Sequence, residues 1–212
     1  MRQFFCFFFL TALFTGPLLA QNKTPFTPPQ WQATMLDAPL TVDGDILNDS
    51  QWKNITPITQ LTQVTPDYGQ PVSENTEIRV GLTEKMLYVA VVCYDSAPEN
   101  IVVSDSRRDA DLGDEDSFLF ILDTYNDQQN GFLFGTNADG MQYDAQIDNE
   151  GEGNFNANRQ QGGVVGGTNI NWDASWEVRT QKGAYGWSAE FAIPLKSIRF
   201  LAGKYGSWLI NF

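Results

Sequence analysis

The chain has 212 residues, no histidine and two cysteines, and its 26 acidic and 13 basic side chains give a formal net charge of −13. This acidic balance disfavours nucleic acid and anionic membrane surfaces as partners, and it suits neutral ligands or cations. The lack of histidine removes the commonest general base and the commonest transition-metal ligand.

Residues 1–20 have the layout of a secretory signal peptide. Arg2 precedes the apolar run FFCFFFLTALF, and Ala20 offers a small residue for cleavage. We therefore expect export to the periplasm, the outer membrane or the extracellular space, with the mature chain beginning near Gln21. Cleavage removes Cys6 and leaves Cys93 without an internal disulfide partner, so the fold has to rest on an apolar core.

Residues 21–37 carry three prolines among polar residues, which predicts an extended linker. Short strands are expected from residue 38 onward. Residues 76–83 alternate between apolar and polar side chains, as a half-buried strand does. Residues 86–94 are apolar on both faces, which predicts a central strand paired with 76–83 as a hairpin around Glu84 and Lys85.

The second half of the chain continues the pattern. Residues 117–123 form another doubly apolar run, and residues 130–136 and 141–147 flank an Asn-Ala-Asp-Gly turn. Residues 172–180 and 185–193 predict a hairpin around 181–183, with Trp176 and Trp187 in the core. Residues 206–212 predict a further strand, on which Trp208 is also expected in the core. Helical turns are expected only at 48–52 and 195–198. Residues 38–212 therefore predict an all-β fold, an antiparallel β-sandwich of jelly-roll-like type.

Five motifs occur in a fixed order along this domain: VDGDILNDSQW, TEIRVGLTEKMLYVAVVCYD, DEDSFLFILD, WDASWEV and GWSAEFAIPLKSIRF. The set resembles the family 9 carbohydrate-binding modules, and is most similar to the N-terminal module of bacterial envelope proteins in which a sandwich precedes a predicted outer-membrane β-barrel. The resemblance implies a non-catalytic module linked to polysaccharide binding or catabolism in the cell envelope, with a polysaccharide or glycan end as ligand. Because a strand pattern runs to Phe212, we expect this chain to be the N-terminal part of a longer protein, with the barrel as a further partner.

Sugar-binding members of family 9 hold a glycan end between two tryptophans, with charged side chains bonding its hydroxyls. In this sequence the first tryptophan corresponds to Gly113 or Asp114, the acidic contact to Leu119 and the basic contact to Leu133. The second tryptophan would lie beyond Phe212. The resemblance thus implies the fold more than the sugar site, and a bound glycan is expected to contact other residues.

The densest run of charge is a candidate recognition loop. It includes Arg107, Arg108, Asp109 and Asp116, and loops at the ends of a sandwich commonly carry binding residues. The alternative is that the two arginines pair with neighbouring carboxylates and fix the loop. Both interpretations stay open at this stage.

Two aromatic residues are further candidates for a ligand platform. Trp172 follows a long loop rich in Gly, Asn and Gln and precedes a strand, so it is the tryptophan most expected to be exposed. Tyr68, in the segment TPDYG, comes next, together with Tyr125.

Calcium is the only cofactor for which the sequence offers candidate ligands. Asp43, Asp45, Asn48 and the neighbouring Asp49 place several oxygen atoms in a short turn. The alternative, which we favour, is a turn at Asp43-Gly44 followed by a short helix capped by Asn48. Weaker cation candidates, with solvated turns as their alternative, are Asp123, Asn126 and Asp127, and Asp144, Asp148, Glu150 and Glu152.

No catalytic apparatus is visible. Glycoside hydrolysis needs two carboxyls fixed across one bond, and the sequence offers no such pair in an apolar setting. It also contains no G-x-S-x-G elbow, phosphate loop or Cys/His metal set. Two alternatives to a carbohydrate-binding module remain: a periplasmic or surface domain that docks on an outer-membrane barrel, and an accessory domain of a glycoside hydrolase.

Overall fold

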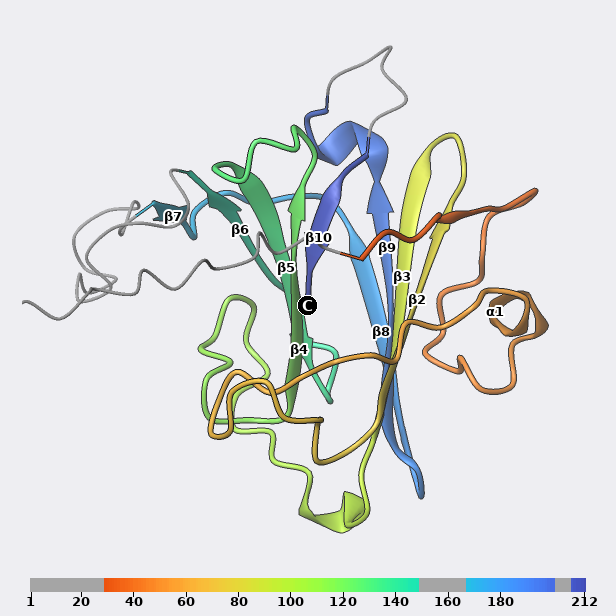
Figure 1. Ribbon diagram of the computed structural model, residues 1–212, viewed down its shortest axis with the longest axis vertical. Helices are drawn as coiled ribbons and strands as arrows, with labels where there is room; N and C mark the ends of the chain where they lie inside the picture. The colour runs from red at the N-terminus through yellow and green to blue at the C-terminus, as the bar shows by residue number, and fades with distance from the viewer. Residues whose placement is uncertain (1–28, 149–166, 201–206) are drawn as a thin grey trace, which may run out of the picture. The chain divides into compact units, whose positions relative to one another are not determined.

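The protein folds as two β-sheets packed face to face (Figure 1). The computed structural model describes residues 29–148, 167–200 and 207–212. The predicted all-β sandwich is confirmed. The predicted signal peptide (1–20), residues 21–28 of the predicted linker (21–37) and most of the Gly/Asn-rich loop lie outside the described residues.

The strands of each sheet are antiparallel to their neighbours, except that β1 runs parallel to β2. The first sheet has, in spatial order, β1 (Thr34–Met35), β2 (Thr76–Leu82), β3 (Met86–Tyr94), β9 (Gly186–Pro194) and β8 (Glu177–Gly183). The second has β10 (Leu209–Asn211), β4 (Ser117–Asp123), β5 (Gly131–Asn137), β6 (Tyr143–Ile147) and β7 (Thr168–Asn169). The short helices are α1 (Ser50–Lys53), η1 (Pro98–Asn100) and η4 (Leu195–Ser197). β1 falls within the range predicted as linker.

The three predicted hairpins are confirmed as β2–β3, β5–β6 and β8–β9. The third turn lies later than predicted, since Gly183 pairs with Gly186 and the turn is at Ala184 and Tyr185 rather than at 181–183. Gly186 has φ +121°, and a Cβ there would lie 2.1 Å from the carbonyl oxygen of Cys93. Only glycine fits this position, so the strand can start there. Two pairings between distant strands, β3–β9 and β4–β10, complete the sandwich.

Aromatic side chains fill the space between the sheets. Phe120, Phe134 and Phe191 are almost fully buried, and Trp176 stacks on Phe191 with ring centroids 5.6 Å apart. Burial of such a side chain stabilises the fold by about 1.5–3 kcal/mol. The predicted core positions of Trp176 and Trp187 are confirmed, while Trp208 and Cys93 are partly buried against the same core. Burial, followed by the charge of Asp116, raises the pKa of Cys93 to about 12.

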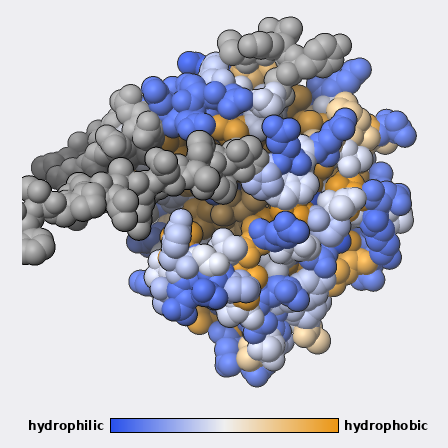
Figure 2. Space-filling model, in the orientation of Figure 1, coloured by the Kyte–Doolittle hydropathy of each residue, from blue (hydrophilic) through white to orange (hydrophobic). Residues whose placement is uncertain are grey.

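Figure 2 shows where this interior meets solvent on one face of the molecule. Orange, apolar surface is visible in the middle of the face, between the positions that the two sheets occupy in Figure 1, and blue residues surround it.

No helix in the described part of the chain is long and apolar enough to cross a membrane.

A second apolar cluster covers the outer face of the first sheet, where α1 lies beside β2 and β3 in Figure 1. Leu40, Ile46, Trp52 and Ile55 pack there against buried β3 residues such as Val92. A sheet of which both faces are covered needs strands that are apolar on both sides, as β3 is. The double pattern of residues 86–94 is therefore explained by this covering segment.

One buried carboxylate fixes the covering segment to the sheet. Glu190 of β9 accepts a hydrogen bond from Trp52 Nε1 at 2.5 Å and from the backbone N–H groups of Asp43 and Gly44, both at 2.7 Å. Burial raises the pKa of Glu190, while these three donors act in the opposite direction. Gly44 has φ +89°, and a Cβ there would lie 2.7 Å from the carbonyl carbon of Thr180. The VDG turn and the tryptophan of the first motif thus meet the glutamate of the last motif.

Candidate functional site

The candidate calcium residues bond mainly to one another and to nearby backbone. The Asp45 carboxylate accepts both an N–H of the Asn48 amide at 2.9 Å and the Asn48 backbone N–H, and Asp43 accepts the Asp45 N–H at 2.9 Å. Asp49, not Asn48, caps α1, through the Gln51 N–H at 2.8 Å. The expected cap was wrong because the Asn48 amide is engaged by Asp45. Calcium binding at this turn stays a prediction.

Among the weaker cation candidates, Asp123 ends β4 and Asp127 lies in the turn after it, whereas Asp144 is buried on β6 and pairs with Arg108, so the alternative of a solvated turn was wrong for Asp144. Asp123 accepts the backbone N–H groups of three residues that follow it, and Asp127 accepts those of Gln129 and Asn130. Glu150 and Glu152 lie outside the described residues. Within residues 29–148, 167–200 and 207–212, no three acidic, cysteine or histidine side chains are grouped as metal ligands would be.

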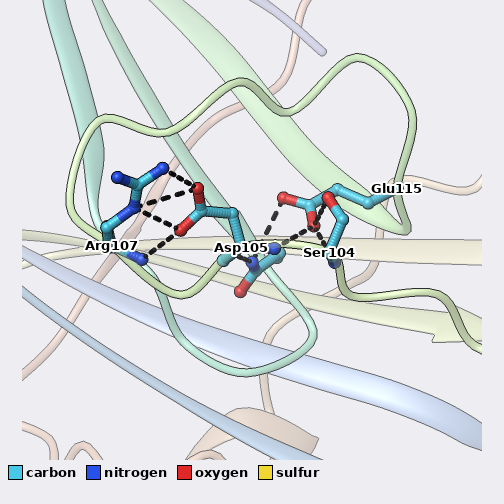
Figure 3. A network of polar contacts seen from close by, with 5 residues as sticks. Ser104, Asp105, Arg107 and Glu115 are labelled. Atoms are coloured by element: carbon cyan, nitrogen blue, oxygen red, sulfur yellow. Dashed lines mark hydrogen bonds and ion pairs between the residues drawn. The ribbon is translucent and has the colours of Figure 1, made fainter.

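The charged loop before β4 is fixed by Glu115 (Figure 3). Glu115 Oε2 accepts the Ser104 N–H at 2.7 Å, and Glu115 Oε1 accepts Asn137 Nδ2 at 3.2 Å. The same amide donates to the Asp105 carbonyl at 2.8 Å. Burial acts to raise the pKa of Glu115, but these hydrogen bonds together hold it below its usual range. Arg107, which is mostly exposed, pairs with Asp105 at 2.6 Å. Asn137 thereby joins this loop to the β5–β6 turn.

Arg108 makes a different set of contacts from its neighbour. Its Nη2 lies 2.5 Å from both Asp144 Oδ1 and Asp173 Oδ1, and its Nη1 donates to Gln142 Oε1 at 2.7 Å. Asp144 is fully buried on β6, and it also accepts the Ala174 N–H at 2.7 Å. Burial raises the pKa of Asp144, against the effect of the Ala174 hydrogen bond and the Arg108 charge. Arg108 therefore joins the loop to β6 and to the segment before β8.

These contacts settle how the two arginines are held. Both pair with carboxylates, as the second of the two open interpretations stated, but only Arg108 joins the loop to distant segments, and a role of the loop in ligand recognition stays a prediction. Asp109 takes a left-handed backbone conformation with φ 58° and lies 3.7 Å from Arg108. Asp116 accepts the Val102 N–H at 2.7 Å and so fixes the start of β4 to the preceding segment.

Two cavities adjoin this loop and differ in the chemistry of their walls. Residues 111–113 of the loop line the first, and Ser106 and Arg108 line the second. The first, which we call the Leu133 pocket, has a volume of about 200 Å³ and is lined by Asp111, Leu112, Gly113, Leu119, Leu133 and Tyr143. Leu119 and Leu133 share the outer face of β4 and β5, because Leu119 pairs with Gly135 and Ile121 with Leu133. Gly113, Leu119 and Leu133, the positions at which the resemblance led us to look for sugar contacts, therefore line one pocket. Its lining is mainly apolar.

The second cavity, which we call the Arg108 cleft, has a volume of about 540 Å³. Three segments line it: the charged loop, the β5–β6 turn and the start of β8. Its polar lining comes from Ser106, Arg108, Gln142, Glu177 and Arg179, beside Trp176. Of the seven residues predicted as ligand contacts, only Arg108 lines either cavity. Gln142, Glu177 and Arg179 were not among the predicted ligand contacts. Gln142 and Arg179 belong to none of the five motifs, and Glu177 lies in WDASWEV, which indicated the fold and not a ligand contact.

Trp172 is partly buried rather than exposed, and its role as a ligand platform stays a prediction. Its ring lies 4.9 Å from that of Phe132 and 6.0 Å from that of Phe134, and the side chain is partly buried against the core. Phe132 and Phe134 point inward from β5, so the segment that leads into β8 places Trp172 on them. Tyr68 is exposed, with 83% of its surface accessible, but it lines neither cavity.

We expect Trp172→Ala to lower the free energy of unfolding by about 1–3 kcal/mol, because it removes an aromatic ring packed on two others. Urea unfolding measures this loss. Tyr68→Ala, at an exposed ring, is the matched control and should leave stability unchanged. Unaltered stability of Trp172→Ala, with lost affinity for a glycan, would instead support Trp172 as a platform.

The comparisons with known proteins identify the fold. No family model matches the sequence. No curated protein matches it either. Among solved structures, a candidate carbohydrate-binding protein from Bacteroides uniformis superposes with a TM-score of 0.51 at 11% identity, over 78% of this chain and 72% of that one. The chain shares its fold with that protein.

Two structures of a family 9 carbohydrate-binding module from Caldicellulosiruptor kristjanssonii are also similar. One is a complex with glucose and the other with cellotriose, and their TM-scores are 0.47 and 0.48. Both are 16% identical to this chain and cover 84% of it, and the matched part is 75% and 73% of the respective module. Family 9 is the family that the ordered sequence motifs resemble.

Proposed function

We propose that this chain is a non-catalytic carbohydrate-binding module. The observation that carries the proposal is the sandwich fold that it shares with the candidate carbohydrate-binding protein from Bacteroides uniformis over 78% of its length. The ordered motifs that resemble family 9 lie on the same sandwich, in β2, β3, β4, β8 and β9 and in the segment that covers β9. Fold alone does not assign a ligand, so the proposal depends on a binding test.

The bonding of the buried carboxylates supports a module without chemistry of its own. Glu190 accepts three hydrogen bonds beneath the covering segment, and Asp144 is paired with Arg108. A glycosidase instead holds two carboxyls on either side of a cleft, where one donates a proton to the bond that breaks. Glu190 and Asp144 are engaged in holding segments together.

The cellular setting is part of the proposal. The N-terminal sequence supports export, and the resemblance to modules that precede an outer-membrane barrel supports a place in the cell envelope. In that setting the module would hold polysaccharide near a partner that imports or degrades it.

Affinity electrophoresis of the purified protein through gels that contain soluble polysaccharides tests the proposal. The gels should contain neutral β-glucan, galactomannan or amylopectin, each with calcium and with a chelator, and a protein of similar charge without sugar affinity serves as the reference. We expect slower migration in at least one neutral polysaccharide. Migration equal to the reference in every gel, with calcium present, would overturn the proposal, and a loss of retardation with chelator would indicate a calcium requirement.

A further inference from the structure

The Arg108 cleft is built from polar side chains that the fold holds in place before any ligand arrives. Gln142 accepts from Arg108 Nη1 at 2.7 Å and donates from Nε2 to the Trp176 carbonyl at 2.8 Å. On the other side of the cleft, Arg179 donates to the Val178 carbonyl at 2.8 Å and pairs with Glu177 at 2.8 Å. Side chains already fixed in this way lose little conformational entropy when they bind a partner.

The hydrogen-bonding inventory of the cleft suits a ligand rich in hydroxyl groups. Arg179 supplies donors, Glu177 supplies acceptors and the Ser106 hydroxyl supplies both, while Arg108 and Gln142 contribute only the N–H groups that their existing hydrogen bonds leave over. A hydroxyl group donates one hydrogen bond and accepts others, so a surface that alternates donors and acceptors can satisfy several neighbouring hydroxyls. The volume of about 540 Å³ lies within the range of ordinary small-molecule sites.

The charges around the cleft disfavour an anionic ligand. The two arginines are each paired with acidic side chains, so neither presents an uncompensated positive charge. Four carboxylates contact them: Glu177 on Arg179, and Asp109, Asp144 and Asp173 on Arg108. Two positive and four negative charges leave a local balance of −2, which repels uronic acids and sulfated sugars and leaves neutral sugars as the class that fits.

The Leu133 pocket fits such a ligand less well. Its volume is about 200 Å³, and Leu112, Leu119 and Leu133 supply most of its walls. Hydroxyl groups placed against these leucines would lose water without gaining a protein partner, which is unfavourable. The polar groups that a sugar needs are gathered instead at the Arg108 cleft.

We infer that the Arg108 cleft, rather than the Leu133 pocket, is the site at which a neutral, hydroxyl-rich glycan binds. This inference rests on the proposed carbohydrate-binding function and assigns that function to a site. Arg179 and Glu177 contact the glycan directly, while Arg108 and Gln142 form the fixed wall opposite them.

Variants of exposed residues test the assignment without disturbing the core. Arg179→Ala and Glu177→Ala remove the paired side chains, which are 58% and 49% exposed, and Ser106→Trp places a large ring at the cleft. The test uses the neutral polysaccharide that retards the wild type. For that polysaccharide we expect each of the three variants to have an apparent affinity at least about tenfold lower than that of the wild type. Polygalacturonate, an anionic polysaccharide, should not retard the wild type.

Two further variants are the controls. Lys182→Ala lies on the same strand as Arg179 and breaks an exposed ion pair with Asp139, but it lines neither cavity, so affinity should stay within about twofold. Gly113→Trp alters the Leu133 pocket and should also leave affinity unchanged. Thermal unfolding of each variant verifies that it is folded.

The outcomes separate the site from the function. Absence of retardation of the wild type in every gel overturns the proposed function itself. Retardation of the wild type that Arg179→Ala, Glu177→Ala and Ser106→Trp leave intact overturns the Arg108 cleft as the site. A change in affinity with Gly113→Trp, in either direction, would move the site to the Leu133 pocket.

Discussion

Glu190→Ala should lower the free energy of unfolding by about 3–5 kcal/mol. The substitution removes one carboxylate that accepts three hydrogen bonds, and it leaves the Trp52 indole N–H and the backbone N–H groups of Asp43 and Gly44 without that acceptor. Each buried donor left unsatisfied costs about 1–3 kcal/mol. The covering segment should therefore detach from the first sheet at a lower urea concentration than in the wild type.

A matched control variant and a double-mutant cycle identify which contacts cause the loss of stability in Glu190→Ala. Glu177→Ala removes a glutamate from the neighbouring strand that is half exposed, and it should change stability by less than about 1 kcal/mol. Trp52→Phe removes the indole donor together with part of the buried ring; the packing loss is common to both backgrounds, so the substitution should be less destabilising in the Glu190→Ala background than in the wild type. Equal losses in both backgrounds would show that the Trp52–Glu190 hydrogen bond does not contribute.

Arg108→Ala should lower the free energy of unfolding by about 2–4 kcal/mol. Asp144 is fully buried, and the substitution removes the cation that lies 2.5 Å from its carboxylate. A buried charge that loses its partner is strongly destabilising, because desolvation is no longer offset. The same substitution frees the charged loop from Asp173 and Gln142. Urea unfolding followed by tryptophan fluorescence measures the loss.

The adjacent arginine provides the control. Arg107→Ala removes a mostly exposed guanidinium that pairs with Asp105, and the unfolding midpoint should not move. Adding Asp144→Asn to Arg108→Ala should recover part of the stability, because the uncompensated charge is then absent. If the two arginine variants are equally stable, the pair between Arg108 and Asp144 makes no net contribution.

The same comparison shows why the sequence could not separate these two residues. Arg107 and Arg108 are neighbours in a run of charged residues, and nothing in that run shows which one meets Asp144, which is 36 residues later, or Asp173. The sequence analysis did offer pairing with neighbouring carboxylates as one interpretation of the charged run. The buried partner of Arg108, however, is Asp144, which lies on β6 and not in that run. The partial burial of Trp172 was not predicted for a related reason, since its partners Phe132 and Phe134 lie on β5.

Local sequence patterns did predict the elements themselves. Alternation in β2, the double apolar pattern of β3 and the Asn-Ala-Asp-Gly turn depend on backbone geometry and on which face of a strand is buried. These are properties of a few consecutive residues, so the strands and hairpins follow from them. The last turn shifted because the need for glycine at residue 186 comes from the Cys93 carbonyl oxygen on β3.

The sequence by itself thus determined an all-β sandwich with its hairpins and an interior of aromatic residues, because period and turn chemistry are local. Only the tertiary structure decided what the motifs do and where a ligand fits. The VDG turn and Trp52 meet Glu190, about 140 residues away, and so the motifs that resemble family 9 hold the fold together. The Arg108 cleft unites three segments through side chains that become neighbours only when the sheets pack, and that proximity is not encoded in any short stretch of the chain.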